Sequence, residues 1–133
     1  MKSVLLDTNS YSKLIRGDRK IVKYIIDTDV VYLSVIVIGE LFGGFEKGTR
    51  RNKNMNDLKE FLSKPNSKTV SVNQKTAQIY GKIRANLSKK GTPIPTNDIW
   101  IAAHVFETGS ILITYDKHFL DIPDLKVWDE LLK

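Results

Sequence analysis

Short apolar runs alternate along this chain with longer segments in which apolar residues recur every three to four positions. This alternation is typical of an α/β domain with a parallel sheet, because each strand must be followed by a crossover, usually a helix, before the next parallel strand. The predicted strands are Lys2–Leu6, Val31–Leu33, Thr69–Val72, Ile111–Thr114 and Lys126–Trp128. The predicted helices are Asn9–Arg16, Arg19–Ile26, Ile36–Phe45, Arg51–Ser63, Thr76–Lys90 and Ile99–Phe106.

Several helix ends carry recognisable signals. Asp18 is placed to cap the second helix, since its side chain can accept a hydrogen bond from a free backbone N–H. The stretch Pro93–Pro95 forces an extended approach to the most apolar helix, so we expect Thr96 or Asn97 to cap it. Gly109 is expected to end that helix.

Composition limits the class of protein. With 133 residues, 41% of them hydrophobic, the chain is expected to form a single domain over residues 1–133 with its own core. The absence of cysteine excludes disulfides and thiolate zinc sites. The longest nearly apolar run, Val30–Gly39, is ten residues and too short to cross a membrane. No secretory signal follows Met1, so we expect an intracellular, cytoplasmic protein.

Positive charge is concentrated in the middle of the chain. Residues 47–90 hold twelve Lys and Arg against two acids, a local charge of +10 within a total of +6. Such a segment favours contact with a polyanion, above all a nucleic acid, although a merely solvated helix face would have the same composition. Arg50, Arg51 and Lys53 are the candidate contacts to such a nucleic acid.

Two predicted strands end in aspartates. Val4-Leu5-Leu6 leads into Asp7, and Ile111-Leu112-Ile113 leads through Thr114 and Tyr115 into Asp116. The carboxyl ends of parallel strands meet at one edge of a sheet, where open α/β sheets bind ligands. Each aspartate alone also has a structural interpretation, as a helix cap or a turn residue.

Two further acids lie in apolar helical surroundings. Glu40 has only apolar residues and glycines three and four positions away, and therefore no local ionic partner. Asp98 opens the most apolar helix, where an acid also complements the helix dipole. Glu40 is thus the harder of the two to explain structurally.

Asp7, Glu40, Asp98 and Asp116 together suggest one acidic cluster. Two carboxylates ~4 Å apart repel by roughly 4 kcal/mol at an effective dielectric constant near 20, so protons or a cation would have to intervene. An all-oxygen site suits Mg²⁺ or Mn²⁺, and such an ion can lower the pKa of bound water and stabilise charge on a phosphodiester.

These residues resemble the PIN-domain family, and within it the VapC-type toxins of toxin–antitoxin pairs. The resemblance rests on Asp7-Thr8-Asn9, an isolated Glu40, the segment Pro95-Thr96-Asn97-Asp98-Ile99-Trp100-Ile101-Ala102-Ala103, and Ile113-Thr114-Tyr115-Asp116 with His118-Phe119. It covers nearly the whole chain and keeps the four acids in order.

The resemblance implies a Mg²⁺- or Mn²⁺-dependent endoribonuclease. Its fold would be a three-layer α/β/α sandwich with a five-stranded parallel sheet in the order 3-2-1-4-5. By similarity, the four acids form the metal-binding, catalytic set, and Thr8, Asn9 and Thr114 support it. Many relatives have an acid at the position of His118, so the number of metals and the exact ligand set stay open.

The resemblance also implies partners: an RNA substrate, a cognate VapB-type antitoxin, and a second copy of the chain in a homodimer. Alternatives are a housekeeping RNA-processing nuclease, a PIN-like module that binds RNA or a partner without cutting, and a phosphohydrolase or DNA nuclease using the same cluster. The two histidines are interpreted structurally, His104 as a core or interface residue and His118 as a loop residue.

Overall fold

The computed structural model describes residues 1–133, and its centre is one five-stranded sheet. The strands are β1 (Ser3–Leu6), β2 (Val30–Ser34), β3 (Ser67–Val70), β4 (Ile111–Ile113) and β5 (Val127–Trp128). All neighbouring strands pair in parallel, in the order β3-β2-β1-β4-β5. The strand order implied by the resemblance is therefore confirmed.

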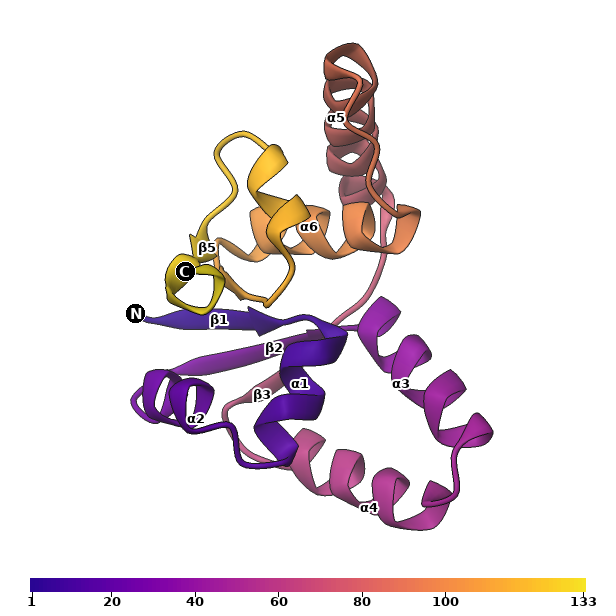
Figure 1. The fold of residues 1–133 in the computed structure, drawn as a ribbon, viewed down its shortest axis with the longest axis vertical. Helices are drawn as coiled ribbons and strands as arrows, with labels where there is room; N and C mark the ends of the chain where they lie inside the picture. Colours follow the sequence, from indigo (N-terminus) through magenta and orange to yellow (C-terminus); the bar gives the residue numbers. More distant parts are fainter.

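Helices cover the sheet on both sides, as predicted for a three-layer α/β/α sandwich. The helices are α1 (Thr8–Ile15), α2 (Arg19–Ile25), α3 (Val35–Lys47), α4 (Arg51–Leu62), α5 (Gln74–Lys90) and α6 (Thr96–Thr108), with 3-10 turns η1 (Lys117–Asp121) and η2 (Asp129–Leu132). In Figure 1, α6 lies above the sheet and α1 below it, while α5 projects beyond α6. None of these helices combines the length and apolar character needed to cross a bilayer.

The core explains why β1 is central. All four residues of Ser3–Leu6 are buried, and Val4, Leu5 and Leu6 are completely inaccessible. A strand covered on both faces must be apolar on both faces, which is why this run is continuous rather than alternating. Leu112 and Ile113 of the neighbouring strand β4 are equally inaccessible, so the apolar centre extends across the middle of the sheet.

The third strand begins two residues earlier than predicted. The apolar and β-branched run predicts Thr69–Val72, whereas β3 spans Ser67–Val70. This strand lies at the edge of the sheet, and its two central residues are exposed. Its position is set by pairing with β2, where Val31 is opposite Ser67, and pairing of this kind leaves little trace in an edge sequence.

The start of α6 also differs from prediction. Neither Thr96 nor Asn97 caps this helix, because both lie inside its first turn. Pro95 is the N-cap residue and makes no side-chain hydrogen bond there. The fixed φ of proline allows the helix to begin immediately after it. The cap predicted for α2 is confirmed, because Asp18 accepts a hydrogen bond from the Ile21 N–H at 3.1 Å. Gly109 ends α6 with φ +66°, as expected.

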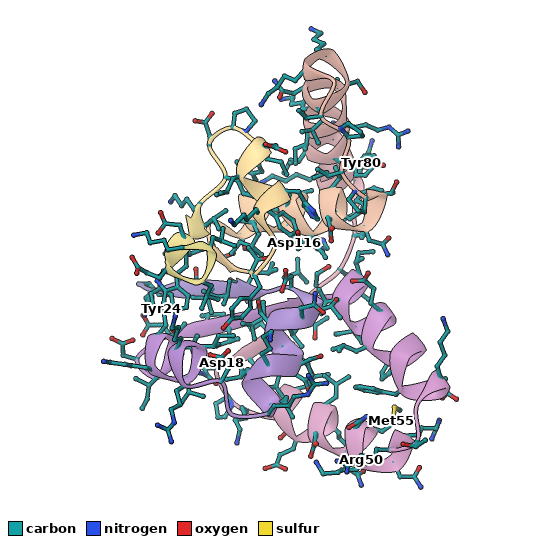
Figure 2. All side chains as sticks on the ribbon, in the orientation of Figure 1. Asp18, Tyr24, Arg50, Met55, Tyr80 and Asp116 are labelled. Carbon is teal, nitrogen blue, oxygen red and sulfur yellow. The ribbon has the colours of Figure 1, made fainter.

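The strand order places the first and fourth strands side by side at the centre. Leu6 of β1 is opposite Ile113 of β4, so the residues that follow, Asp7 and Thr114, leave the sheet next to each other. Helices leave in different directions at this point, which is where open α/β sheets bind ligands. In Figure 2, Asp116 is labelled between α6 and β1.

Candidate active site

Asp7 is both a helix cap and a member of the site. Its side chain is almost fully buried; Oδ1 accepts the Ser10 N–H at 2.9 Å and Oδ2 accepts the Thr114 hydroxyl at 2.5 Å. The Asp116 N–H donates to the same Thr114 oxygen at 2.9 Å. Thr114 therefore connects the two aspartates that follow β1 and β4. Asp7 therefore caps α1 with one carboxylate oxygen and contacts Thr114 with the other, so capping is compatible with a role in the site.

Glu40 lies on α3 and is exposed. It accepts hydrogen bonds from the Thr8 hydroxyl at 2.6 Å and from the Asn97 amide at 3.4 Å. No lysine, arginine or histidine forms an ion pair with it, and neutral groups from α1 and α6 orient it instead. Asn97, expected as a helix cap, has this other role. Asn9 is exposed and makes no side-chain hydrogen bond.

His118 links the two remaining acids. Its Nε2 lies 2.8 Å from Asp98 Oδ2, and its Nδ1 lies 3.0 Å from Asp116 Oδ1. Each of these three residues offers one ligand atom, and these three atoms lie within 4.8 Å of one another. The expectation of a loop histidine is wrong, because η1 turns the ring back toward the acids. The available signal is its position two residues after Asp116, where the family resemblance implies an acid.

Burial, and to a smaller extent the neighbouring negative charges, disfavours the charged form of two of the four carboxylates. Burial raises the pKa of the Asp7 carboxyl, and the charge on Asp116 acts in the same direction. Burial also raises the pKa of Asp98; His118 opposes this shift, while the charges on Glu40 and Asp116 add to it. No lysine or arginine forms an ion pair with any of the four. Asp98, Asp116 and His118 offer ligand atoms within 4.8 Å of one another. That Asp7 and Glu40 complete one metal site with them stays a prediction.

The donor set fits a hard divalent cation. Carboxylate oxygens from Asp7, Asp98, Asp116 and Glu40 are the ligands that Mg²⁺ and Mn²⁺ prefer, and no thiolate competes. Each carboxylate oxygen has two lone pairs, so the hydrogen bonds to Asp7 leave acceptor capacity. His118 adds a nitrogen donor to the same corner.

A cleft of about 470 Å³ adjoins Glu40 between α1, α3 and α4. Thr8 and Glu40 line one part of it, and Arg16, Arg50 and Lys53 line another. Arg50 lies at the turn from α3 to α4 in Figure 2. Neither arginine forms an ion pair, so both are available to an anionic ligand. A phosphate chain lying in this cleft would meet cationic side chains next to the acidic cluster.

The three basic residues predicted to contact RNA are placed differently from one another. Arg51 does not line the cleft, because its Nε donates to Glu46 Oε1 at 2.6 Å. Lys53 lines the cleft and pairs with Asp57 at 2.9 Å. Sequence reasoning misses Arg16, since it lies far outside the basic segment and only the fold brings the end of α1 to this cleft.

Comparison with known proteins gives a consistent result. A family model described as the PIN domain matches residues 4–125, which include all four acids. Ribonuclease VapC1 of Haemophilus influenzae is 30% identical over 97% of this chain and 98% of the relative. The tRNA(fMet)-specific endonuclease VapC of Salmonella typhimurium is 28% identical over the same shares. The crystal structure of VapBC2 from Rickettsia felis, bound to a DNA fragment from their promoter, aligns with a TM-score of 0.82 and 27% identity, covering 94% of this chain and 96% of that one.

Proposed function

Because the chain belongs to the PIN-domain family, we propose that it is a Mg²⁺- or Mn²⁺-dependent endoribonuclease and the toxin of a VapBC-type pair. The observation that supports this proposal is the arrangement at the carboxyl edge of the sheet. Asp98 and Asp116 flank His118, Thr114 joins Asp7 to Asp116, none of these acids pairs with lysine or arginine, and a cationic cleft lies alongside. Acids held together in this way are destabilising unless a cation joins them.

Asp7, Asp98 and Asp116 would hold the ion directly or through water, with Glu40 completing the pocket. When bound, the ion supplies a water of lowered pKa and stabilises negative charge on the phosphodiester. Thr114 fixes Asp7 and Asp116 relative to each other through its two hydrogen bonds. These contacts keep the acidic ligands in place before the ion or RNA arrives, which reduces the reorganisation needed for catalysis.

Glu40 is suited to face the substrate. It is exposed, lines the cleft, and is oriented by Thr8 and Asn97. RNA phosphates held by Arg16, Arg50 and Lys53 would place a neighbouring phosphodiester next to this side chain. Contacts of this kind are electrostatic and largely independent of sequence, so they position the RNA rather than select a cleavage site.

The toxin role rests on the VapC relatives and on the solved VapBC structures. We propose a cognate VapB-type antitoxin as partner, a homodimer as the assembly of the chain, and action in the cytoplasm, where cellular RNA is found. Four carboxylates without a permanent counter-charge suit a guanidinium group from such a partner, since arginine binds carboxylates in a bidentate way.

An RNA-cleavage assay tests the proposed activity. Purified protein is incubated with tRNA(fMet), the substrate in a relative's name, with other RNAs, and with single-stranded DNA, in Mg²⁺, Mn²⁺ or chelator. We expect RNA cleavage with either ion, none in chelator, and none by Asp7→Asn, whose contact with the Ser10 N–H can persist. Equal cleavage in chelator and in Mg²⁺ would overturn the metal-dependent mechanism.

A growth assay tests the biological role. Expression of the wild type is expected to slow growth, Asp7→Asn should remove the effect, and co-expression of a neighbouring antitoxin gene should restore growth. A wild type as harmless as the mutant, with RNA cleavage established in vitro, would instead favour a housekeeping RNA-processing role.

A further inference from the structure

His104 is a completely buried polar residue in the middle of α6, and it connects three segments of the fold. Its Nδ1 lies 2.8 Å from the hydroxyl of Ser34, the last residue of β2 and the N-cap of α3. Its Nε2 lies 3.2 Å from the backbone carbonyl of Ser71, just beyond β3. The expectation that His104 is a satisfied core residue is confirmed, but its partners are specific.

These partners determine the protonation of the ring. The Ser71 carbonyl can only accept, so Nε2 must carry the proton. Nδ1 of the neutral ring then accepts the Ser34 O–H, and the same Ser34 oxygen accepts the Ile36 N–H at 3.0 Å. Every polar atom in this group has a partner in the neutral Nε2–H tautomer. Burial lowers the pKa of His104, and Glu107 is the charged neighbour that opposes this shift.

The bond to Ser34 is one of two polar links between α6 and α3. The other joins Asn97 to Glu40 in the site. His104 lies seven residues after Asn97, about 10.5 Å along α6, while Ser34 lies six residues before Glu40, about 9 Å along α3. These two links join α6 to the first half of α3 at two points and so restrain how α6 can move relative to α3.

We propose that His104 is a positioning residue: its bond to Ser34 holds α6 in the place relative to α3 at which Asp98 and Glu40 would serve one divalent cation site. This proposal rests on the proposed nuclease function. Asp98 lies one residue from Asn97, so a shift of α6 along α3 moves it relative to Glu40. Misplacement of a catalytic group by about 1 Å can reduce the rate about 10²-fold.

Two amide substitutions separate the two bonds of His104. In His104→Asn, Oδ1 occupies the place of Nδ1 and can accept from Ser34, while the contact with Ser71 is lost. In His104→Gln, Nε2 occupies the place of the ring Nε2 and can donate to Ser71, while the contact with Ser34 is lost. Both variants replace a buried ring by a smaller amide, so they are matched controls for packing.

The measurements are kcat and KM for RNA cleavage in saturating Mn²⁺, together with the thermal midpoint of each variant. We expect both midpoints to fall by similar amounts, with kcat about tenfold lower for His104→Gln than for His104→Asn and little change in KM. Equal kcat values for the two variants would overturn the proposal. A wild type without metal-dependent cleavage would instead contradict the proposed function itself.

A double-mutant cycle with Ser34→Ala provides a second test that does not depend on His104→Asn folding well. Ser34→Ala and His104→Gln each remove the same hydrogen bond, the one between Ser34 and His104. If His104 acts through Ser34, kcat of the double variant should therefore be no lower than that of the poorer single variant. Losses in kcat that multiply in the double variant would overturn the proposal.

Discussion

The acidic residues at the two ends of the sheet differ in whether a basic side chain pairs with them. At the amino end, near Tyr24 in Figure 2, Lys2 pairs with Asp27 at 3.1 Å and its backbone N–H donates to Asp29 at 2.8 Å. At the carboxyl end, near Asp116, His118 pairs with Asp98 and Asp116, and no lysine or arginine pairs with any of the four acids. One sheet therefore carries a neutralised acidic end and an uncompensated one.

This difference separates structural acids from functional ones. The pKa of Asp27 is lowered by its hydrogen bond and charge interaction with Lys2, so the fold favours its charged form. The pKa of Asp98 is raised, so the same fold disfavours its charge until a cation is supplied. Uncompensated charge at a topological switch point is a mark of a ligand site.

The largest expected effect comes from neutralising one acid at each end. Asp98→Asn should reduce metal-dependent RNA cleavage by about 10³-fold, equivalent to about 4 kcal/mol of barrier, because it removes a metal ligand. Asp27→Asn is the matched control and should leave the rate unchanged, measured under the same saturating Mg²⁺. Equal losses in the two variants would break the distinction between the ends.

Metal-linked stability should follow the same division. Mg²⁺ or Mn²⁺ at one hundred times its Kd should stabilise the wild type by about 2.7 kcal/mol, because it binds only the assembled cluster. Thermal unfolding measures this gain, which should be retained by Asp27→Asn and shrink in Asp98→Asn. Without metal, Asp98→Asn should unfold at a higher temperature than the wild type, since the neutral amide avoids the cost of burying a charge. A wild-type unfolding midpoint that does not change with either ion would contradict a single cation site formed by these acids.

RNA binding should depend on the cleft at the carboxyl end. On an Asp98→Asn background, which prevents cleavage, replacing Arg16 and Arg50 by alanine should weaken binding and reduce the salt slope by about 0.7 per residue. Fluorescence anisotropy across a salt series measures both quantities. The control replaces the exposed Lys20 and Lys23 near the amino end. Identical slopes in the two double variants would indicate a diffuse charge effect.

The smallest expected effect is a pH dependence from His104. Its folded pKa is lowered, so the unfolded chain takes up a proton first and stability is lost as pH falls below about 6.5. The contribution is fully present above that pH. Subtracting the unfolding free energies of His104→Asn from those of the wild type between pH 8 and about 5 isolates it. A difference that does not change with pH would contradict a buried neutral ring.

Much of the fold is predictable because local patterns agree with the global arrangement. The apolar run at Val4–Leu6 predicts a strand, and Asp18 and Gly109 predict helix ends. The order of the strands comes from the family resemblance and not from the pattern itself. The edge strand β3 is displaced from its predicted position because its register depends on pairing with β2, which its own half-exposed sequence does not encode.

The site is predictable where the signal lies in single residues. Asp7 and Asp116 follow apolar strands, and Glu40 and Asp98 lie in apolar helical surroundings, so the sequence suggests that these acids form one cluster. The positions of His118 and Arg16 are not predictable in this way, because their roles depend on how η1 turns back and where α1 ends. Contacts across such distances are properties of the fold, not of sequence spacing.

The central claim is that four acids from separate parts of the chain form one divalent cation site. Calorimetric titration of Mn²⁺ into metal-free protein tests it directly, with the variants Asp7→Asn, Glu40→Gln, Asp98→Asn and Asp116→Asn compared with Asp27→Asn. The account predicts that each of the four site variants weakens the same binding event while Asp27→Asn matches the wild type. Wild-type affinity in the site variants, or equal weakening in Asp27→Asn, would contradict it.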